Sequence, residues 1–334
     1  MNETTPAVKR SKKRVLDQNL ILLVLIVVLA IVATIVNPRF LRITNIINIF
    51  QQIAVLGIVA SGVGVLLISG HIDISVGSQV SLMGVIVAMV IQRMLGLPDL
   101  EVSQWSIRLA YPVAFLATFG TGFLLGLING LVVIRAKAAS FIITLGFMTV
   151  YHGVALLVSR GGSYTLYGRF ESLGRGRIFN VIPVSILFFL GVVLLAFIIL
   201  KYLRFGRFLY AIGDNQKAAY VSGINTNRII VSGYIMVGLL NALAAIIMIS
   251  RVGTALASTG DAYGLDSLAS VVVGGVAITG GKGNALSIFL GVVLIGLIGN
   301  ALVVMNVNPY MRDVVIGLII VAAVTISEVT GEQS

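Results

Sequence analysis

The stretch LILLVLIVVLAIVATIV, residues 20–36, contains no charged side chain and decides the fold class of this chain. As an α-helix, a run of this length can cross the roughly 30 Å hydrocarbon core of a bilayer. The basic run at residues 9–14 precedes it, as in a signal peptide, but no small-residue cleavage site accompanies it. The sequence therefore predicts an uncleaved first membrane span.

Nine further apolar segments follow the first one. Of the 334 residues, 58% are hydrophobic and only 10% are charged, whereas soluble domains carry about 25% charged residues. We predict an all-α fold, a polytopic integral membrane helical bundle with about ten transmembrane or re-entrant helices. The ten segments run near residues 19–36, 46–69, 74–92, 109–134, 140–159, 182–203, 226–250, 265–280, 284–305 and 310–328.

No polar stretch is long enough to bury a core of its own, so the chain contains one membrane domain. Because the first basic run usually dominates orientation, we expect both termini to be cytoplasmic. The N-terminus is then residues 1–18, the transmembrane domain 19–328 and the C-terminus 329–334. The arginine-rich segment 160–181 falls on the outer side, against the positive-inside trend.

Composition excludes several kinds of site. The chain has no cysteine, which excludes disulfides, thiolate metal sites and cysteine nucleophiles, and its two histidines argue against a multi-histidine metal site. The net charge of +11 is interpreted as basic residues that face lipid headgroups, not nucleic acid. The glycines around Lys282 lack the spacing of a phosphate loop, so we expect no nucleotide to bind this chain.

The polar segment 204–226, RFGRFLYAIGDNQKAAYVSGINT, is the longest basic loop on the predicted cytoplasmic side. Its middle predicts a short helix from Asp214 to Ser222, with Asp214 or Asn215 as the N-terminal cap and Gly223 as the stop. Such a helix can dock a partner. The alternative is an amphipathic helix that lies on the headgroups.

A second polar segment, SGHIDISVGS at residues 69–78, joins two apolar segments. Ionisable side chains within a membrane are costly and are therefore functional candidates. Asp73, Ser75 and Gln79, together with Asp266 in a later segment, are candidate pathway or gating residues. Asp73 has a second interpretation, because it can cap a helix that begins near Ile74.

Two patterns concern packing. Gly122, Gly126 and Gly130 lie on one face of the fourth segment and predict close approach of a neighbouring helix. The stretch 65–78 also resembles 271–284, since both pass from apolar residues through glycine into a short polar loop. Matching broken helices in two halves often mark a transport site, although glycine-rich helices also align by chance. His152 is either a helix-contact residue or a pathway residue.

Four pieces of the sequence resemble the permease subunits of bacterial ABC importers for ribose, galactose, xylose and related monosaccharides. They are SGHIDISVGS at 69–78, FIITLG at 141–146, RFGRFLYAIGDNQKAAYVSGIN at 204–225 and YGLDSLASVVVGGVAITGGKG at 263–283. The resemblance extends from about Asn19 to Glu328. Two departures are His71, where the family commonly has glycine, and the arginine-rich segment 160–181.

The resemblance implies a transporter subunit of the bacterial inner (plasma) membrane that does no catalysis itself. It implies an ABC ATPase, often with two fused nucleotide-binding domains, which binds ATP and Mg while this chain binds no cofactor. It further implies a periplasmic or extracellular sugar-binding protein and a second permease chain, as a homodimer or a heterodimer. The implied ATPase-coupling residues are Gly206, Asp214, Ala218, Ala219 and Gly223.

Other functions remain open at this point. Within the family the solute could instead be a nucleoside, inositol, a furanose signal or a branched-chain amino acid. An ion-coupled secondary transporter would need an intramembrane charge relay, for which the sequence offers Asp73, Asp266 and little else. A membrane-embedded enzyme would need clustered carboxylates, histidines or a metal site at one membrane face, and the sequence shows none.

Overall fold

The computed structural model describes residues 9–98, 102–136, 138–308, 311, 313–318 and 321. This part of the chain contains ten helices with defined bounds and four two-residue strands, and residues 313–318 are also helical. Eight of the helices are long and apolar enough to cross a membrane, which confirms the predicted helical membrane bundle. The elements are α1 (Lys9–Val36), α2 (Ile43–Leu67), α3 (Val76–Met94), α4 (Gln104–Ala136), α5 (Ser140–Ser159), β1 (Tyr164–Thr165), β2 (Arg177–Ile178), β3 (Ile182–Pro183), α6 (Val184–Tyr202), α7 (Arg204–Val221), α8 (Thr226–Val252), β4 (Thr254–Ala255), α9 (Ala262–Val273) and α10 (Ala285–Val304).

Nine of the ten predicted apolar segments correspond to helices. The eighth segment, predicted over 265–280, is only the 12-residue helix α9, which ends before Gly274. It is therefore a short helix followed by a loop, and not one continuous helix over the predicted range. Most of the tenth segment, 310–328, and the C-terminus at 329–334 lie outside the described residues.

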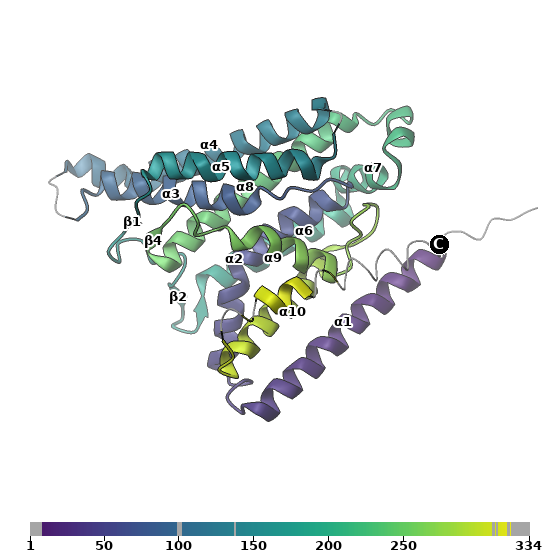
Figure 1. Ribbon diagram of the computed structural model, residues 1–334, viewed down its shortest axis with the longest axis horizontal. Helices are drawn as coiled ribbons and strands as arrows, with labels where there is room; N and C mark the ends of the chain where they lie inside the picture. Colours follow the sequence, from purple (N-terminus) through teal and green to yellow (C-terminus); the bar gives the residue numbers. More distant parts are fainter. Residues whose placement is uncertain are drawn as a thin grey trace, which may run out of the picture.

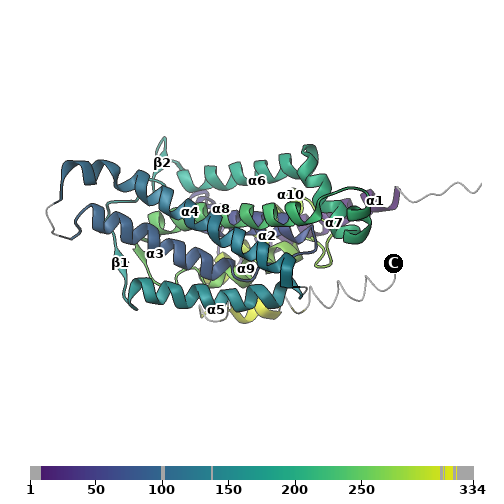
Figure 2. The same cartoon turned by 90° about the horizontal axis from the view of Figure 1, so that it is seen from above.

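The bundle has two distinct ends. Helix α7 lies at one end, and the small strands, including the antiparallel pair β1–β4, lie at the other. The view from above shows the same separation (Figure 2). The N-terminal end of α1 lies on the side of α7 (Figure 1). We refer to these as the α7 end and the strand end.

The centre of the bundle is formed by α2, α3 and α8. In α2, 83% of an apolar stretch of 18 residues is buried, compared with 17% of the corresponding stretches of α1 and α5. Helix α1 lies at one side of the bundle against α10, with α4 and α5 on the far side (Figure 1). The peripheral helices therefore expose long apolar faces, as expected for contact with lipid or with other membrane chains.

Helices α4 and α8 are the most closely packed pair. A Cβ atom on Gly122 would overlap the backbone carbonyl oxygen of Gly238, and one on Gly126 would overlap that of Tyr234. A Cβ atom on Gly130 would lie 2.9 Å from the α8 backbone. The predicted glycine face of the fourth segment is thus confirmed, because only residues without a side chain allow the two backbones to come so close.

Two helix breaks face each other inside the bundle. The first separates α2 from α3 between Leu67 and Val76, and the second separates α9 from α10 between Val273 and Ala285. These are the two stretches that resemble each other in sequence, and both have the form helix, loop, helix. The backbone N–H of Gly281 in the second break donates to the carbonyl oxygen of Ile68 in the first, at 2.8 Å.

Candidate transport site and partner-docking helix

Asp73 lies in the first break and is 2% exposed. Its carboxylate accepts hydrogen bonds from four donors. One oxygen accepts the backbone N–H (2.9 Å) and the hydroxyl of Ser75. The other accepts the side-chain amides of Gln79 and Asn129, each at 3.0 Å. All four donors are neutral, so hydrogen bonds alone hold this carboxylate in the interior.

These contacts continue into neighbouring helices. The hydroxyl of Tyr151 on α5 donates to Asn129 on α4 at 2.6 Å, and the amide of Asn241 on α8 donates to Gln79 on α3 at 3.0 Å. We call Asp73, Ser75, Gln79, Asn129, Tyr151 and Asn241 the Asp73 cluster. It connects the first break to four helices.

Of the candidate pathway residues, Asp73, Ser75 and Gln79 are brought together in this cluster. Asp266 does not take part in the hydrogen bonds of Asp73 and is instead buried on α9. The sequence interpretation missed Asn129, Tyr151 and Asn241. The signal that could have identified them is a polar side chain in the middle of an apolar segment.

The capping role expected of Asp73 is not found. Helix α3 begins at Val76, not near Ile74, and its N-cap residue Ser75 makes no side-chain capping hydrogen bond. The Asp73 carboxylate accepts the backbone N–H of Ser75 and so holds the turn that precedes the helix.

Neighbouring helices also bind part of the non-helical backbone in this break. Ile72 N–H donates to Ser140 (3.0 Å), Ile74 N–H donates to Thr144 (3.2 Å), and Tyr234 donates to the Ile72 carbonyl (3.1 Å). Irregular backbone can exist at membrane depth only with such partners.

Helix α7 corresponds to the polar segment 204–226 and is longer than the predicted helix. It is kinked at Asn215, whose backbone is extended (φ −159°, ψ 102°). The side chain of Asn215 accepts the backbone N–H of Ala218 at 3.0 Å and so caps the second part of α7. This matches one of the two expected caps, and Asp214 does not serve as the other. Gly223, at φ +85°, follows the helix end as the expected stop.

Ala218 and Ala219, two of the implied ATPase-coupling residues, differ in exposure. Ala219 is only 5% exposed and points into the chain, so it cannot present its side chain to a partner. Ala218 is exposed, and so are Tyr220 (69%) and Val221 (85%). We call Ala218, Tyr220 and Val221 the α7 surface. Gly206 packs at the first turn of α7 against the backbone of Ile199 and Leu200.

The first part of α7 contacts both helix breaks. A Cβ atom on Gly213 would overlap the Ile68 carbonyl oxygen and the Gly281 backbone nitrogen. Asp214 lies against Gly281, and the hydroxyl of Tyr210 donates to the carbonyl oxygen of Gly283 at 2.7 Å. The first part of α7 therefore has direct contacts through which a movement could reach these two breaks.

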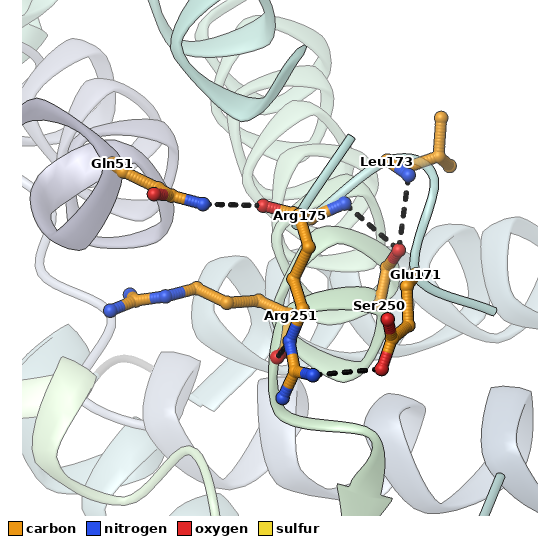
Figure 3. Close-up of polar contacts among 7 residues, drawn as sticks. Gln51, Glu171, Leu173, Arg175, Ser250 and Arg251 are labelled. Atoms are coloured by element: carbon orange, nitrogen blue, oxygen red, sulfur yellow. Dashed lines mark hydrogen bonds and ion pairs between the residues drawn. The ribbon is translucent and has the colours of Figure 1, made fainter. Parts of the chain in front are cut away.

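At the strand end, the arginine-rich segment is fixed to the bundle (Figure 3). The hydroxyl of Ser250 on α8 accepts the backbone N–H groups of Leu173 (3.1 Å) and Gly174 (2.9 Å). Gln51 on α2 donates to the Gly174 carbonyl at 2.9 Å.

Arg175 reinforces the same turn. Its guanidinium donates to the Arg251 carbonyl and to Glu171, both at 2.7 Å. The segment between α5 and α6 is thus an ordered surface. Among the described residues, no group of three His, Cys, Asp or Glu side chains could hold a metal ion.

Comparison with known proteins relates this architecture to transport. Residues 45–324 match the family described as the branched-chain amino acid transport system permease component. No solved structure matches the chain. The family match covers both helix breaks and α7.

Several curated relatives are similar over almost their whole length. The ribose import permease proteins of Bacillus subtilis and Haemophilus influenzae are each 36% identical to this chain, over 89% and 92% of it and 88% and 92% of their own lengths. The galactose/methyl galactoside import permease protein of Haemophilus influenzae is 35% identical, over 93% of this chain and 94% of its own. The chain therefore belongs to this family of transport-system permease components, as a non-catalytic, multi-pass membrane subunit.

Proposed function

We propose that this chain is the translocating subunit of an ATP-driven importer for a monosaccharide, a ribose-like pentose or a hexose. The observation that carries the proposal is the similarity to ribose and galactose import permeases over about nine-tenths of both chains. The family description names a different solute class, so the sugar assignment depends on the individual relatives.

The proposed topology places the α7 end in the cytoplasm. The N-terminal basic run, residues 9–14, forms the start of α1 at this end, and further basic residues lie on or beside α7, namely Lys201, Arg204, Arg207, Lys217 and Arg228. A cytoplasmic excess of basic residues near helix ends sets membrane orientation. Residues 1–18 and 329–334 are then cytoplasmic, and the ordered strand end faces outward.

A permease component of an ABC importer works with an ATPase and a solute-binding protein. In the proposed arrangement the ATPase binds ATP and Mg and docks on the α7 surface, while the binding protein delivers solute to the strand end. A second permease chain, most simply a second copy, completes the translocation unit beside the exposed apolar faces.

Coupling follows from the contacts of α7. ATPase movement enters at the second part of α7 and passes through Tyr210, Gly213 and Asp214 to the two helix breaks. The Asp73 cluster fixes the first break to α4, α5 and α8. We therefore assign Asp73, Ser75 and Gln79 a gating role, in which they hold the break that must move when access changes sides.

Reconstitution tests this proposal. The chain, its ATPase and its binding protein are placed in vesicles, and uptake of radiolabelled D-ribose and D-galactose is measured with and without ATP. We expect ATP-dependent uptake of one of them, with little competition from uridine, inositol or leucine. Uptake that ignores ATP and stops on adding a protonophore would instead indicate an ion-coupled transporter. Strong competition by leucine would favour the amino-acid branch of the family.

A further inference from the structure

Two ionisable side chains outside the Asp73 cluster face each other on the surface of the single chain. Nδ1 of His152, on α5, lies 3.6 Å from Oδ2 of Asp261, just before α9. Both side chains remain open, with exposed fractions of 38% and 42%. A close pair of this kind on the side of a membrane helix requires an explanation.

The pair lies well within the membrane span. Seven residues separate His152 from the end of α5 at Ser159, which places it about 10 Å below that end at 1.5 Å per residue. Oδ1 of Asp261 accepts the hydroxyl of Ser81 at 3.1 Å, and Ser81 lies near the inner start of α3. The loop before α9 therefore dips from the strand end into the bundle.

Hydrocarbon cannot surround such a pair. Ionisable residues within membrane segments face the bundle interior or a water-filled cavity. Since His152 and Asp261 are open in the single chain, the space next to them must hold water, solute or polar protein.

Both side chains are held on rigid supports. Gly260 N–H donates to Ser81 at 2.8 Å, and a Cβ atom on Gly77 would lie 2.7 Å from the Asp261 carbonyl oxygen. These contacts fix the loop on α3. On α5, the residue before His152 is Tyr151, whose hydroxyl anchors the helix in the Asp73 cluster. The two groups are thus presented at a defined separation.

We propose that His152 and Asp261 form a hydrogen-bonding site for a neutral polyhydroxylated solute on its way across the membrane. This inference rests on the proposed function and specifies where the solute passes. A carboxylate accepts hydrogen bonds from hydroxyl groups, and an imidazole both donates and accepts. Two polar groups on an open surface bind weakly, which suits a site that must release its solute.

The position of the site links it to gating. Consecutive residues of α5 face two ways, Tyr151 into the Asp73 cluster and His152 toward Asp261. The glycine contact between α3 and the loop before α9 joins the two regions a second time. A movement of the first helix break therefore reaches His152 and Asp261 inside the bundle, through α5 and through the contact between α3 and the loop before α9.

Two measurements test the site, and the first is uptake. Asp261→Asn and His152→Phe are compared with the control Asp313→Asn, which changes an exposed acidic residue outside the proposed site, the helix breaks and the α7 surface. In reconstituted vesicles we expect both site variants to lower D-ribose or D-galactose uptake at least tenfold, with unchanged ATPase co-purification. The control should change uptake less than twofold. Wild-type uptake by both site variants would overturn the proposal.

The second measurement is water accessibility, which does not require the solute to be known. Because the chain has no cysteine, the thiol of His152→Cys is unique. We expect a water-soluble methanethiosulfonate to modify it from one side of the membrane, at a rate that changes on adding ATP. Reaction with a lipid-soluble maleimide alone would overturn the site. If the wild-type chain takes up no sugar but His152→Cys is still labelled in this way, the result would count against the proposed function. The water-accessible path beside residue 152 would then still stand.

Discussion

Gly213 of α7 lies so close to Ile68, at the end of α2, that a Cβ atom on the glycine would overlap the Ile68 carbonyl oxygen. That oxygen also accepts the Gly281 N–H from the second helix break. Three segments far apart in the sequence therefore meet at one point, and a residue on the docking helix contacts both breaks. If ATPase movement is transmitted through this contact, a larger side chain at residue 213 should impair transport.

We expect Gly213→Ala to impair transport more than it impairs assembly. The added methyl group must displace backbone, and overpacking of this kind costs about 1–3 kcal/mol. The measurements are sugar uptake and ATP hydrolysis in vesicles, with a fall in uptake per ATP hydrolysed as the expected result.

Gly191→Ala on α6 is the matched control for Gly213→Ala, since a Cβ atom at Gly191 meets nothing within 4 Å. Equal uptake per ATP in the two variants would remove this contact from the coupling route.

The Asp73 cluster leads to a ranking of substitutions. Asp73→Asn keeps one oxygen for the Ser75 donors but turns an amide toward the side-chain amides of Gln79 and Asn129. An unmet buried donor costs about 1–3 kcal/mol. Asp73→Leu removes all four acceptor contacts and should destabilise the protein further.

Thermal melting in detergent measures this ranking, with wild type above Asp73→Asn and Asp73→Asn above Asp73→Leu. If Asp73→Asn melts like wild type and yet transports nothing, the carboxylate has a direct role in transport and its structural role is minor.

The sequence predicts the helices well because each apolar run is a local property. One helix boundary differs from the prediction, since α3 begins at Val76 and the Asp73 side chain holds the turn before it. The Asp73 cluster was only half predicted. Asn129 is 56 residues from Asp73 and Asn241 is 162 residues from Gln79, and such pairs depend on which helices become neighbours.

The α7 surface shows another limit of sequence reasoning. Ala218 and Ala219 are consecutive in one helical segment and therefore point about 100° apart. The extended backbone at Asn215 starts this segment, in which Ala218 is exposed and Ala219 is buried. Capping residues were visible in the sequence, but the direction in which the helix departs depends on the packing of its first part against the breaks.

Tyr220 on the α7 surface is expected to contribute to docking of the ATPase. Tyr220→Ala removes a 69% exposed aromatic ring, and aromatic residues are enriched among the side chains that dominate protein interfaces. We expect the ATPase to co-purify at least fivefold less with this variant, while membrane insertion stays normal.

Phe179→Ala is the control for Tyr220→Ala, because Phe179 is 91% exposed at the strand end and should leave ATPase retention unchanged. Full ATPase retention by Tyr220→Ala would favour the alternative in which α7 lies on lipid headgroups.

Topology is tested with single cysteines in the cysteine-free chain. The thiol of Phe179→Cys should react with an impermeant maleimide added outside intact cells, and that of Tyr220→Cys only after the membrane is opened. Both positions are exposed in the single chain, so access to the reagent depends on the side of the membrane. Labelling of Tyr220→Cys in intact cells would reverse the proposed orientation.

The hydrogen bonds of Ser250 are expected to keep the turn at the strand end closed. Its hydroxyl oxygen accepts two backbone N–H groups, those of Leu173 and Gly174, and a Cβ atom on Gly174 would overlap the α8 backbone. Ser250→Ala leaves both N–H groups without this acceptor, at a cost of about 1–3 kcal/mol each where water cannot replace it. The turn that carries Arg175 should then open more often, and trypsin should cleave there several times faster in membrane vesicles.

Ser222→Ala is the matched control, since that exposed hydroxyl only donates to the Ala218 carbonyl within α7. If Ser250→Ala is cleaved no faster than this control, the Arg175 and Gln51 contacts hold the turn without the serine, and the surface offered to a binding protein does not depend on Ser250.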